Sequence, residues 1–166
     1  MRRAAAALLL VSAATLPQAV TPGSSDLPGC GRHTWKHIYN PSRLLVINQC
    51  VVVTGTIADA SHGRSKDGVR HEADGDTHGW LAVDGPFVWM LNDGNRSEEG
   101  GNLVFEVPCY FPVHQQDAVQ ACEGYHAPTS VPPIGTRVRI TGSLVQDTNH
   151  GRWNEIHPVV MIERLR

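Results

Sequence analysis

The chain has 166 residues, of which 41% are hydrophobic and 18% are charged, with 11 Pro and 16 Gly. This length fits one globular domain, and the composition excludes a disordered or collagen-like chain. The formal net charge is only −2 at pH 7, which argues against a dedicated duplex-DNA binder because such proteins present a strongly basic surface.

The N-terminal segment has the layout of a secretory signal peptide. Arg2 and Arg3 precede an apolar run over 4–16, which is too short to span a bilayer, and no later run is long enough. We expect residues 1–19 to be removed, leaving a soluble chain that begins near Val20 and is secreted or exposed on the cell envelope. Loss of the two arginines leaves 12 basic against 16 acidic residues, a charge of about −4.

Four cysteines remain after this cleavage, and an even number in an exported chain favours two disulfides. Three pairings are possible; the preferred one joins Cys30 to Cys50 and Cys109 to Cys122, because each bond closes a short loop. Lipidation of Cys30 is an alternative that would leave three cysteines. The absence of a C-x-x-C motif argues against a redox enzyme or a cysteine zinc site.

Alternation of apolar residues and enrichment in β-branched residues predict five strands along the rest of the chain. The last strand is expected to direct Ile156, Val160 and Ile162 toward the core. In chain order the predicted strands run over 43–58, 77–84, 103–107, 136–144 and 154–163.

A single short helix is predicted, between the third and fourth strands. Four residues there recur with the spacing of one helical face: Ala118, Ala121, Cys122 and Tyr125. We expect no second core helix and no helix before Phe105. The segment 93–99 offers side-chain oxygens at alternate positions, as a calcium loop does, but Glu98 stands where the tight turn needs glycine. It is predicted to be a surface loop.

Three strands, a helix and two further strands are the order of the OB-fold, a five-stranded Greek-key barrel. The chain is therefore predicted to be all-β, with an OB-like barrel over 43–166 and an extension over 20–42 that Cys30 attaches to it. A small β-sandwich is the alternative architecture. OB-folds commonly hold their ligand between the loop that joins strands 1 and 2 and the loop that joins strands 4 and 5, which here are 59–75 and 147–152.

Histidines are concentrated near these two loops. The chain has nine, and five lie in or beside the loops: His62, His71, His78, His150 and His157. The surrounding sequence reads H-x-x-D-G-D-x-H over 71–78 and W-x-E-I-H-P over 153–158. With the strands over 43–55 and 135–142, these motifs resemble a family of small exported microbial proteins. The resemblance implies a fold class and no assigned activity. Here Gly79 follows His78 where an ordinary alternating strand is expected.

Two carboxylate–imidazole pairs each share a strand face, because residues two apart on a strand point the same way. Asp76 precedes His78 by two positions, and Glu155 precedes His157 by two. Nitrogen and oxygen ligands at near-tetrahedral positions suit zinc, and a higher share of oxygens suits manganese. We therefore predict a divalent metal site at the barrel rim, with zinc favoured. The candidate ligands are His71, Asp76, His78, His150, Glu155 and His157.

Other interpretations stay open. Glu155 and His157 could simply hydrogen-bond and hold the last strand in place. The chain could instead be a non-catalytic binding module for an oligosaccharide, a peptide or single-stranded nucleic acid, with Trp80 and Trp153 stacking on the ligand. The sequence contains no standard hydrolase, Walker or dinucleotide motif, so it does not decide whether the chain is an enzyme. If it is, Glu155 is the expected proton acceptor.

Overall fold

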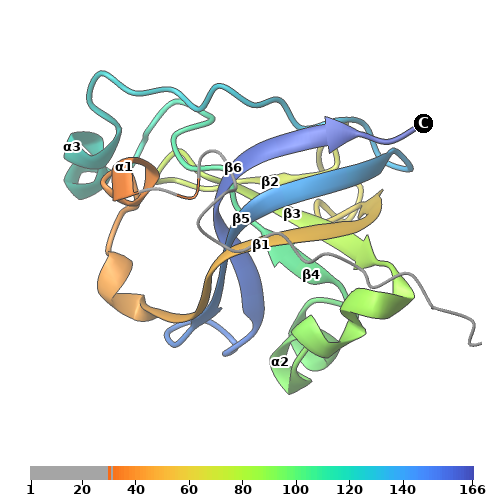
Figure 1. Ribbon diagram of the computed structural model, residues 1–166. Coiled ribbons are helices and arrows are strands. Elements are labelled where there is room, and N and C mark those ends of the chain that lie inside the picture. The colour runs from red at the N-terminus through yellow and green to blue at the C-terminus, as the bar shows by residue number, and fades with distance from the viewer. Residues whose placement is uncertain (1–29, 31) are drawn as a thin grey trace, which may run out of the picture.

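Five strands close into a barrel in the computed structural model, which describes Cys30 and residues 32–166. They are β1 (Leu44–Ala58), β3 (Thr77–Val83), β4 (Leu103–Phe105), β5 (Arg137–Asp147) and β6 (Asn154–Arg164). Neighbours pair in the order β1, β5, β6, β4 and β3, and a further pairing of β1 with β3 closes the barrel (Figure 1). The β4–β6 pair is parallel and the other barrel pairs are antiparallel. The fold is thus the predicted OB-like barrel rather than a sandwich.

Short elements connect the barrel strands. The two-residue strand β2 (Arg70–His71) pairs with β3, and α1 (Arg32–Trp35) and the 3-10 helix η1 (Pro41–Arg43) precede β1. The 3-10 helix η2 (Gly85–Met90) and α2 (Asp93–Glu98) lie between β3 and β4, and η3 (Gln116–Ala118) and α3 (Val119–Cys122) lie between β4 and β5. Figure 1 shows α1 and α3 next to each other on one side of the barrel and α2 on another.

Two predictions about helices were wrong. Helices α1 and α2 both lie before Phe105, and α2 occupies the segment predicted to be a surface loop. It is held by a reciprocal cap, in which the side chains of Asn92 and Asn95 each accept a hydrogen bond from the other's backbone N–H, at 3.0 and 3.1 Å. The helix predicted over Ala118–Tyr125 consists only of the short η3 and α3, and the chain leaves it before Gly124, which has a φ of 68°.

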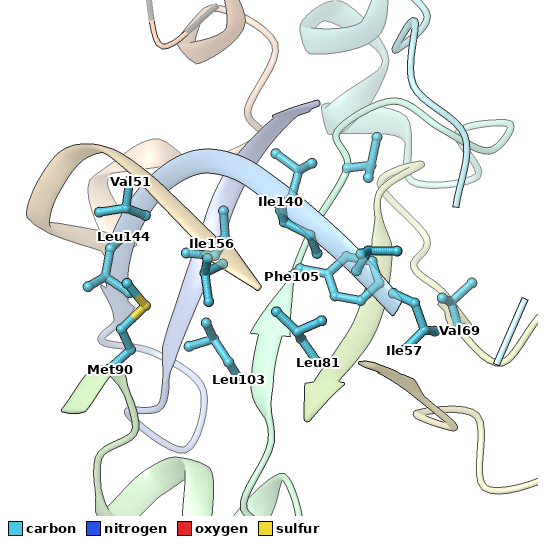
Figure 2. Packing of buried hydrophobic residues seen from close by; sticks show 14 of the residues in the cluster. Val51, Ile57, Val69, Leu81, Met90, Leu103, Phe105, Ile140, Leu144 and Ile156 are labelled. Carbon is cyan, nitrogen blue, oxygen red and sulfur yellow. The ribbon is translucent and has the colours of Figure 1, made fainter. Parts of the chain in front are cut away.

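Aliphatic side chains and one aromatic ring fill the barrel interior, as Figure 2 shows. Ile57 of β1, Leu81 of β3 and Ile140 of β5 are at most 1% exposed, and the ring of Phe105 on β4 is fully buried among them. These residues lie on the faces that strand alternation predicts to be apolar. The packed interior therefore leaves polar side chains to the barrel's margins and loops.

The last strand departs from the predicted alternation. Strands β5 and β6 shift register on either side of Gly142, and such a bulge changes the face on which the following side chains lie. Ile156 and Val159 are buried in the core, Ile162 packs against its margin, and Val160 is half-buried outside it. The prediction that Val160 faces the core was wrong.

Gly79 explains why the alternation of β3 is interrupted after His78. Gly79 pairs with Phe105 of β4, and a Cβ atom at Gly79 would lie 2.1 Å from Cζ of the Phe105 ring. Such an approach is far inside van der Waals contact, so any side chain here would displace the ring from the core. The glycine therefore serves core packing, and it lets the strand carry His78 close to β4.

The two disulfides join Cys30 to Cys50 and Cys109 to Cys122, each with a Cα–Cα distance of 5.4 Å. This is the pairing preferred from loop length, and it leaves no thiol at Cys30 for lipidation. The predicted signal peptide over 1–19 and its cleavage near Val20 lie outside the described residues. Within the part of the chain that is described, no helix has the length and apolar composition needed to cross a membrane.

Candidate functional site

Buried acidic and histidine side chains form a cluster where β3, β4 and β6 lie side by side. Asp76 directly precedes β3 and His78 lies within it; Glu106 directly follows β4; Glu155 and His157 lie on β6. The side-by-side pairing of β4 with both β3 and β6 brings these positions together. All five residues are at most 6% exposed. Ionisable groups are rarely buried to this degree unless they are paired or bind a metal.

His157 stands among three carboxyl groups. Its Nδ1 lies 2.9 Å from Glu106 Oε2 and 3.1 Å from Glu155 Oε1. Its Nε2 lies 3.4 Å from Asp76 Oδ2. The indole N–H of Trp153 donates a 2.9 Å hydrogen bond to Glu155 Oε2, which holds that carboxyl in place. The His157 imidazole therefore contacts carboxyl groups that lie at or next to the ends of β3, β4 and β6.

Glu106 connects this group to the second histidine. Nδ1 of His78 lies 3.3 Å from Glu106 Oε1, and its Nε2 lies 2.8 Å from Glu99 Oε2. The same oxygen of Glu99 accepts a 2.5 Å hydrogen bond from the indole of Trp80 and a 2.8 Å bond from Arg70 Nη2. The Arg70 guanidinium also contacts His78 Nε2. The cluster is therefore one continuous network of charged groups.

The carboxylates set the protonation of both histidines. Burial by itself lowers the pKa of His157, but the Glu106 charge and the contacts with Asp76 and Glu155 outweigh burial, and the pKa lies well above its usual value. Burial also lowers the pKa of His78, and hydrogen bonds to Glu106 and Glu99 outweigh it, raising that pKa to about 9. Both imidazoles are therefore in the positively charged imidazolium form at neutral pH, unless a bound metal ion replaces one of the two protons.

The carboxyl groups differ among themselves. Burial raises the pKa of Asp76 to about 6, although His157 opposes the shift. Burial would also raise the pKa of Glu106, but the charges and hydrogen bonds of His157 and His78 hold it well below its usual value. Burial and the neighbouring Glu106 charge raise the pKa of Glu155. Glu106 is thus an ionised group at the centre of the network at neutral pH.

Two atoms in the cluster have no hydrogen-bond partner. Asp76 Oδ2 and His157 Nε2 are both buried and make no hydrogen bond; they face each other only as a long ion pair at 3.4 Å. The ligand atoms of Asp76, Glu106 and His157 all lie within 4.8 Å of one another. Asp76 Oδ1 accepts a 2.8 Å hydrogen bond from the backbone N–H of Cys109, so the carboxylate is oriented with Oδ2 free. These three residues could hold a metal ion.

A cavity of about 410 Å³ lies beside the cluster and shares His78 and Glu106 with it. It is bounded by the two loops where OB-folds commonly bind ligands, since Glu72 and Asp74 come from the first and Asn149 and His150 from the second. The remaining lining residues are Tyr39, Asn40, Arg43, Arg70, Ala73, Gln115 and Trp153.

No protein-family model, curated protein or solved structure that was compared with the chain matches it. The resemblance of segments 71–78 and 153–158 to a family of exported proteins therefore stays a prediction. The cluster and the cavity are therefore the features that bear on function.

Four of the six predicted metal ligands lie in the cluster: Asp76, His78, Glu155 and His157. The other two lie outside it. His71 is exposed, stacks on Phe111 with ring centroids 3.6 Å apart, and contacts Asp67 Oδ2 through Nε2 at 2.7 Å. The His150 side chain is 60% exposed, and its Nδ1 lies 2.9 Å from Asp147 Oδ2. His150 nevertheless lines the cavity.

The two predicted stacking residues differ in position. Trp153 lines the cavity and is half-buried. Trp80 is not among the lining residues; it donates its N–H to Glu99, and the ring of His62 meets it edge-on with centroids 5.1 Å apart. Only Trp153 is therefore placed to contact a molecule in this cavity.

Glu106, Glu99 and Arg43 belong to the site but were not among the predicted site residues. Val104 and Glu106 alternate with the apolar Leu103, Phe105 and Val107, yet both are buried. An acidic residue inside the apolar run from Leu103 to Val107 was the available sequence signal. Glu99 lies just after α2, where the sequence was compared only with a calcium loop.

Proposed function

We propose that the protein binds one divalent metal ion through Asp76, Glu106 and His157. The proposal rests on Asp76 Oδ2 and His157 Nε2, two buried atoms that make no hydrogen bond and face each other as a long ion pair at 3.4 Å. Two ligands that are each about 2.0–2.1 Å from a tetrahedral ion lie about 3.3 Å from one another. The two atoms thus have the separation that a shared ion needs. Leaving these buried polar atoms without a hydrogen bond or a metal also costs free energy.

The donor set narrows the choice of ion. One imidazole nitrogen and two carboxylates suit zinc, and the high share of oxygen also suits manganese. The Cys109 backbone N–H would orient Asp76, and Trp153 would orient Glu155 beside the histidine. A bound ion would replace the proton that His157 otherwise carries, since a ligating imidazole is neutral.

Metal content and one isosteric variant test this proposal. Protein purified without a metal-affinity tag is expected to contain about one zinc or manganese ion per chain by elemental analysis. Asp76→Asn keeps the side-chain shape and the acceptor for Cys109, so it is expected to fold. Its affinity for the added ion, measured by titration calorimetry on chelator-stripped protein, should fall by more than about 100-fold.

Glu99→Gln is the matched control, because Glu99 is also buried and bonded to a histidine but lies outside the three-residue group. It is expected to keep its metal. No stoichiometric ion at neutral pH, or unchanged affinity in Asp76→Asn, would contradict the proposal. Loss of the ion in Glu99→Gln alone would move the site to His78.

We further propose that the protein is exported. Support comes from the apolar run over 4–16 behind Arg2 and Arg3, and from the two disulfides, which persist in oxidising compartments. Protein recovered from outside the cytoplasm of an expressing cell is expected to begin near Val20 by N-terminal sequencing. A chain that retains Met1 and free thiols would contradict this localisation.

A further inference from the structure

Unpaired polar atoms are concentrated at the cavity and the neighbouring cluster. Five buried side-chain atoms of the described residues lack a hydrogen-bond partner, and four of them belong to this region. Two are the Asp76 and His157 atoms discussed above. The other two are Arg43 Nη1 and Arg70 Nε, and both arginines line the cavity. Native structures rarely leave buried donors unpaired without a functional reason.

Arg43 is only 8% exposed and is poorly satisfied. Its two ion pairs, to Glu106 at 3.6 Å and to Asp147 at 3.4 Å, are both longer than a normal hydrogen bond. Its Nη1 has no partner at all. A guanidinium group carries five N–H donors and no acceptor. Arg43 therefore lines the cavity with a buried donor nitrogen that none of the described residues satisfies.

Arg70 lines the same cavity and also has a donor nitrogen without a partner. Its Nη2 is bonded to Glu99 at 2.8 Å, while its Nε is buried without a partner. Because guanidinium groups supply only donors, the group that satisfies them must be rich in acceptors. The planar fork of arginine matches the oxygens of a carboxylate or a phosphate.

The rest of the wall suits a ring-bearing small molecule. A volume of about 410 Å³ lies within the range of small-ligand sites. Two aromatic residues line it, and each has its polar end tied down: Tyr39 Oη donates to Asp117 at 2.6 Å, and Trp153 Nε1 donates to Glu155 at 2.9 Å. Aromatic rings that are fixed in place by such hydrogen bonds are suited to packing against a sugar or a base.

We propose that the cavity binds a small molecule whose phosphate or carboxylate group is held by Arg43 and Arg70 and whose sugar or base ring packs on Trp153 and Tyr39. A small anion is favoured over an extended polyanion, because the wall also carries the carboxyl groups of Glu72, Asp74 and Glu106 and the chain is acidic overall. This inference goes beyond the proposed metal centre and does not require it, since guanidinium groups bind oxyanions with or without a neighbouring ion.

Calorimetric titration of the chelator-stripped protein with five probes tests the inference: inorganic phosphate, glucose 6-phosphate, galacturonate, uridine 5′-monophosphate and uncharged glucose. At least one ring-bearing anion is expected to bind about tenfold or more tightly than glucose. Comparison of glucose 6-phosphate with galacturonate separates phosphate from carboxylate, and comparison with the nucleotide separates a sugar from a base. Failure of every probe to bind at about 10 mM overturns the inference.

Substitutions of the two arginines test whether they bind the anion. Arg43→Lys keeps a positive charge beside Glu106 but loses the fork, and Arg70→Gln removes a charge from a partly exposed side chain. Each should weaken binding of the best anion about tenfold, with thermal unfolding confirming that the variant is folded. Arg139→Gln, an exposed arginine paired with Glu163 at 3.7 Å outside the cavity, is the control and should bind normally.

Two outcomes would overturn the inference while leaving the metal proposal intact. One is unchanged anion affinity in both Arg43→Lys and Arg70→Gln. The other is anion binding that appears only after zinc or manganese is added and ignores both substitutions, which would make the metal itself the anion's partner. Conversely, arginine-dependent binding by a protein that holds no metal would support the inference and contradict only the metal proposal.

Discussion

Replacing His157 with leucine is expected to lower the free energy of unfolding by about 3–5 kcal/mol at pH 8, because it removes the cation from the middle of a buried ionic cluster. Leucine is similar in size to the imidazole, so a cavity contributes little. The main loss is electrostatic, because Glu155 and Asp76 remain buried without their cationic partner. Glu106 keeps only its longer contacts with His78 and Arg43. Denaturant unfolding of chelator-treated protein measures the change.

The pH dependence of this loss distinguishes charge from packing. Without the imidazolium, burial raises the pKa values of Asp76 and Glu155 with no histidine to oppose it, so these two groups take up protons as the pH falls. Below pH 6.5 the parent keeps the His157 proton in both the folded and the unfolded chain, so the loss should be smaller at pH 5 than at pH 6.5. His126→Leu, at an exposed position, should change stability by less than about 0.5 kcal/mol. Adding Glu106→Gln to His157→Leu should recover part of the stability. Equal losses at both pH values would contradict the ionic explanation.

Local periodicity was enough to predict the barrel. Each barrel strand lies within a few residues of a segment with alternating or β-branched residues, and the strand order set the architecture. Helix α2 escaped prediction for a physical reason. It is six residues long and has no apolar stripe, and it is stabilised instead by the reciprocal hydrogen bonds of Asn92 and Asn95. A cap of this kind leaves only a weak trace in sequence.

Strand period likewise predicted part of the site. Because residues two apart on a strand share a face, Glu155 and His157 were expected to lie together, and they are 3.1 Å apart. Alternation tells which side of a strand a residue faces, but not whether that side is covered. Alternation sets Glu106 apart from the apolar face of its strand, and in the fold its side chain is buried among His78, His157 and Arg43. Its role could therefore be recognised only in three dimensions.

The remaining site residues are joined by contacts between distant parts of the chain. Glu99 meets His78 across 21 positions, and Arg43 meets Asp147 from the far end of β5. Neither pair lies on one strand or one helix, so no local period connects them. His71 and His150 lie near the other predicted ligands in sequence, but both are exposed at the surface of the folded chain. Closeness in sequence therefore predicted which residues join the cluster less well than a shared strand face did.

His78 should give the metal-free protein a stability that declines in mild base. Its pKa is raised from 6.5 to about 9 by hydrogen bonds to Glu106 and Glu99 that outweigh burial. Between these two values the folded chain keeps a proton that the unfolded chain has lost, so the free energy of unfolding falls as pH rises. The contribution is fully present below pH 6.5 and is lost as pH rises through about 9; the shift corresponds to about 3 kcal/mol.

Denaturant unfolding at steps between pH 6.5 and 9.5 in the presence of chelator measures this decline. Titration of Asp76 does not interfere, because its raised pKa of about 6 places its own loss of stability at lower pH. His78→Gln keeps a hydrogen-bonding side chain but cannot titrate, so this variant should be less stable than the parent at pH 6.5 and converge with it near pH 9.5. A parallel decline in parent and variant would assign the effect to His157 or another group.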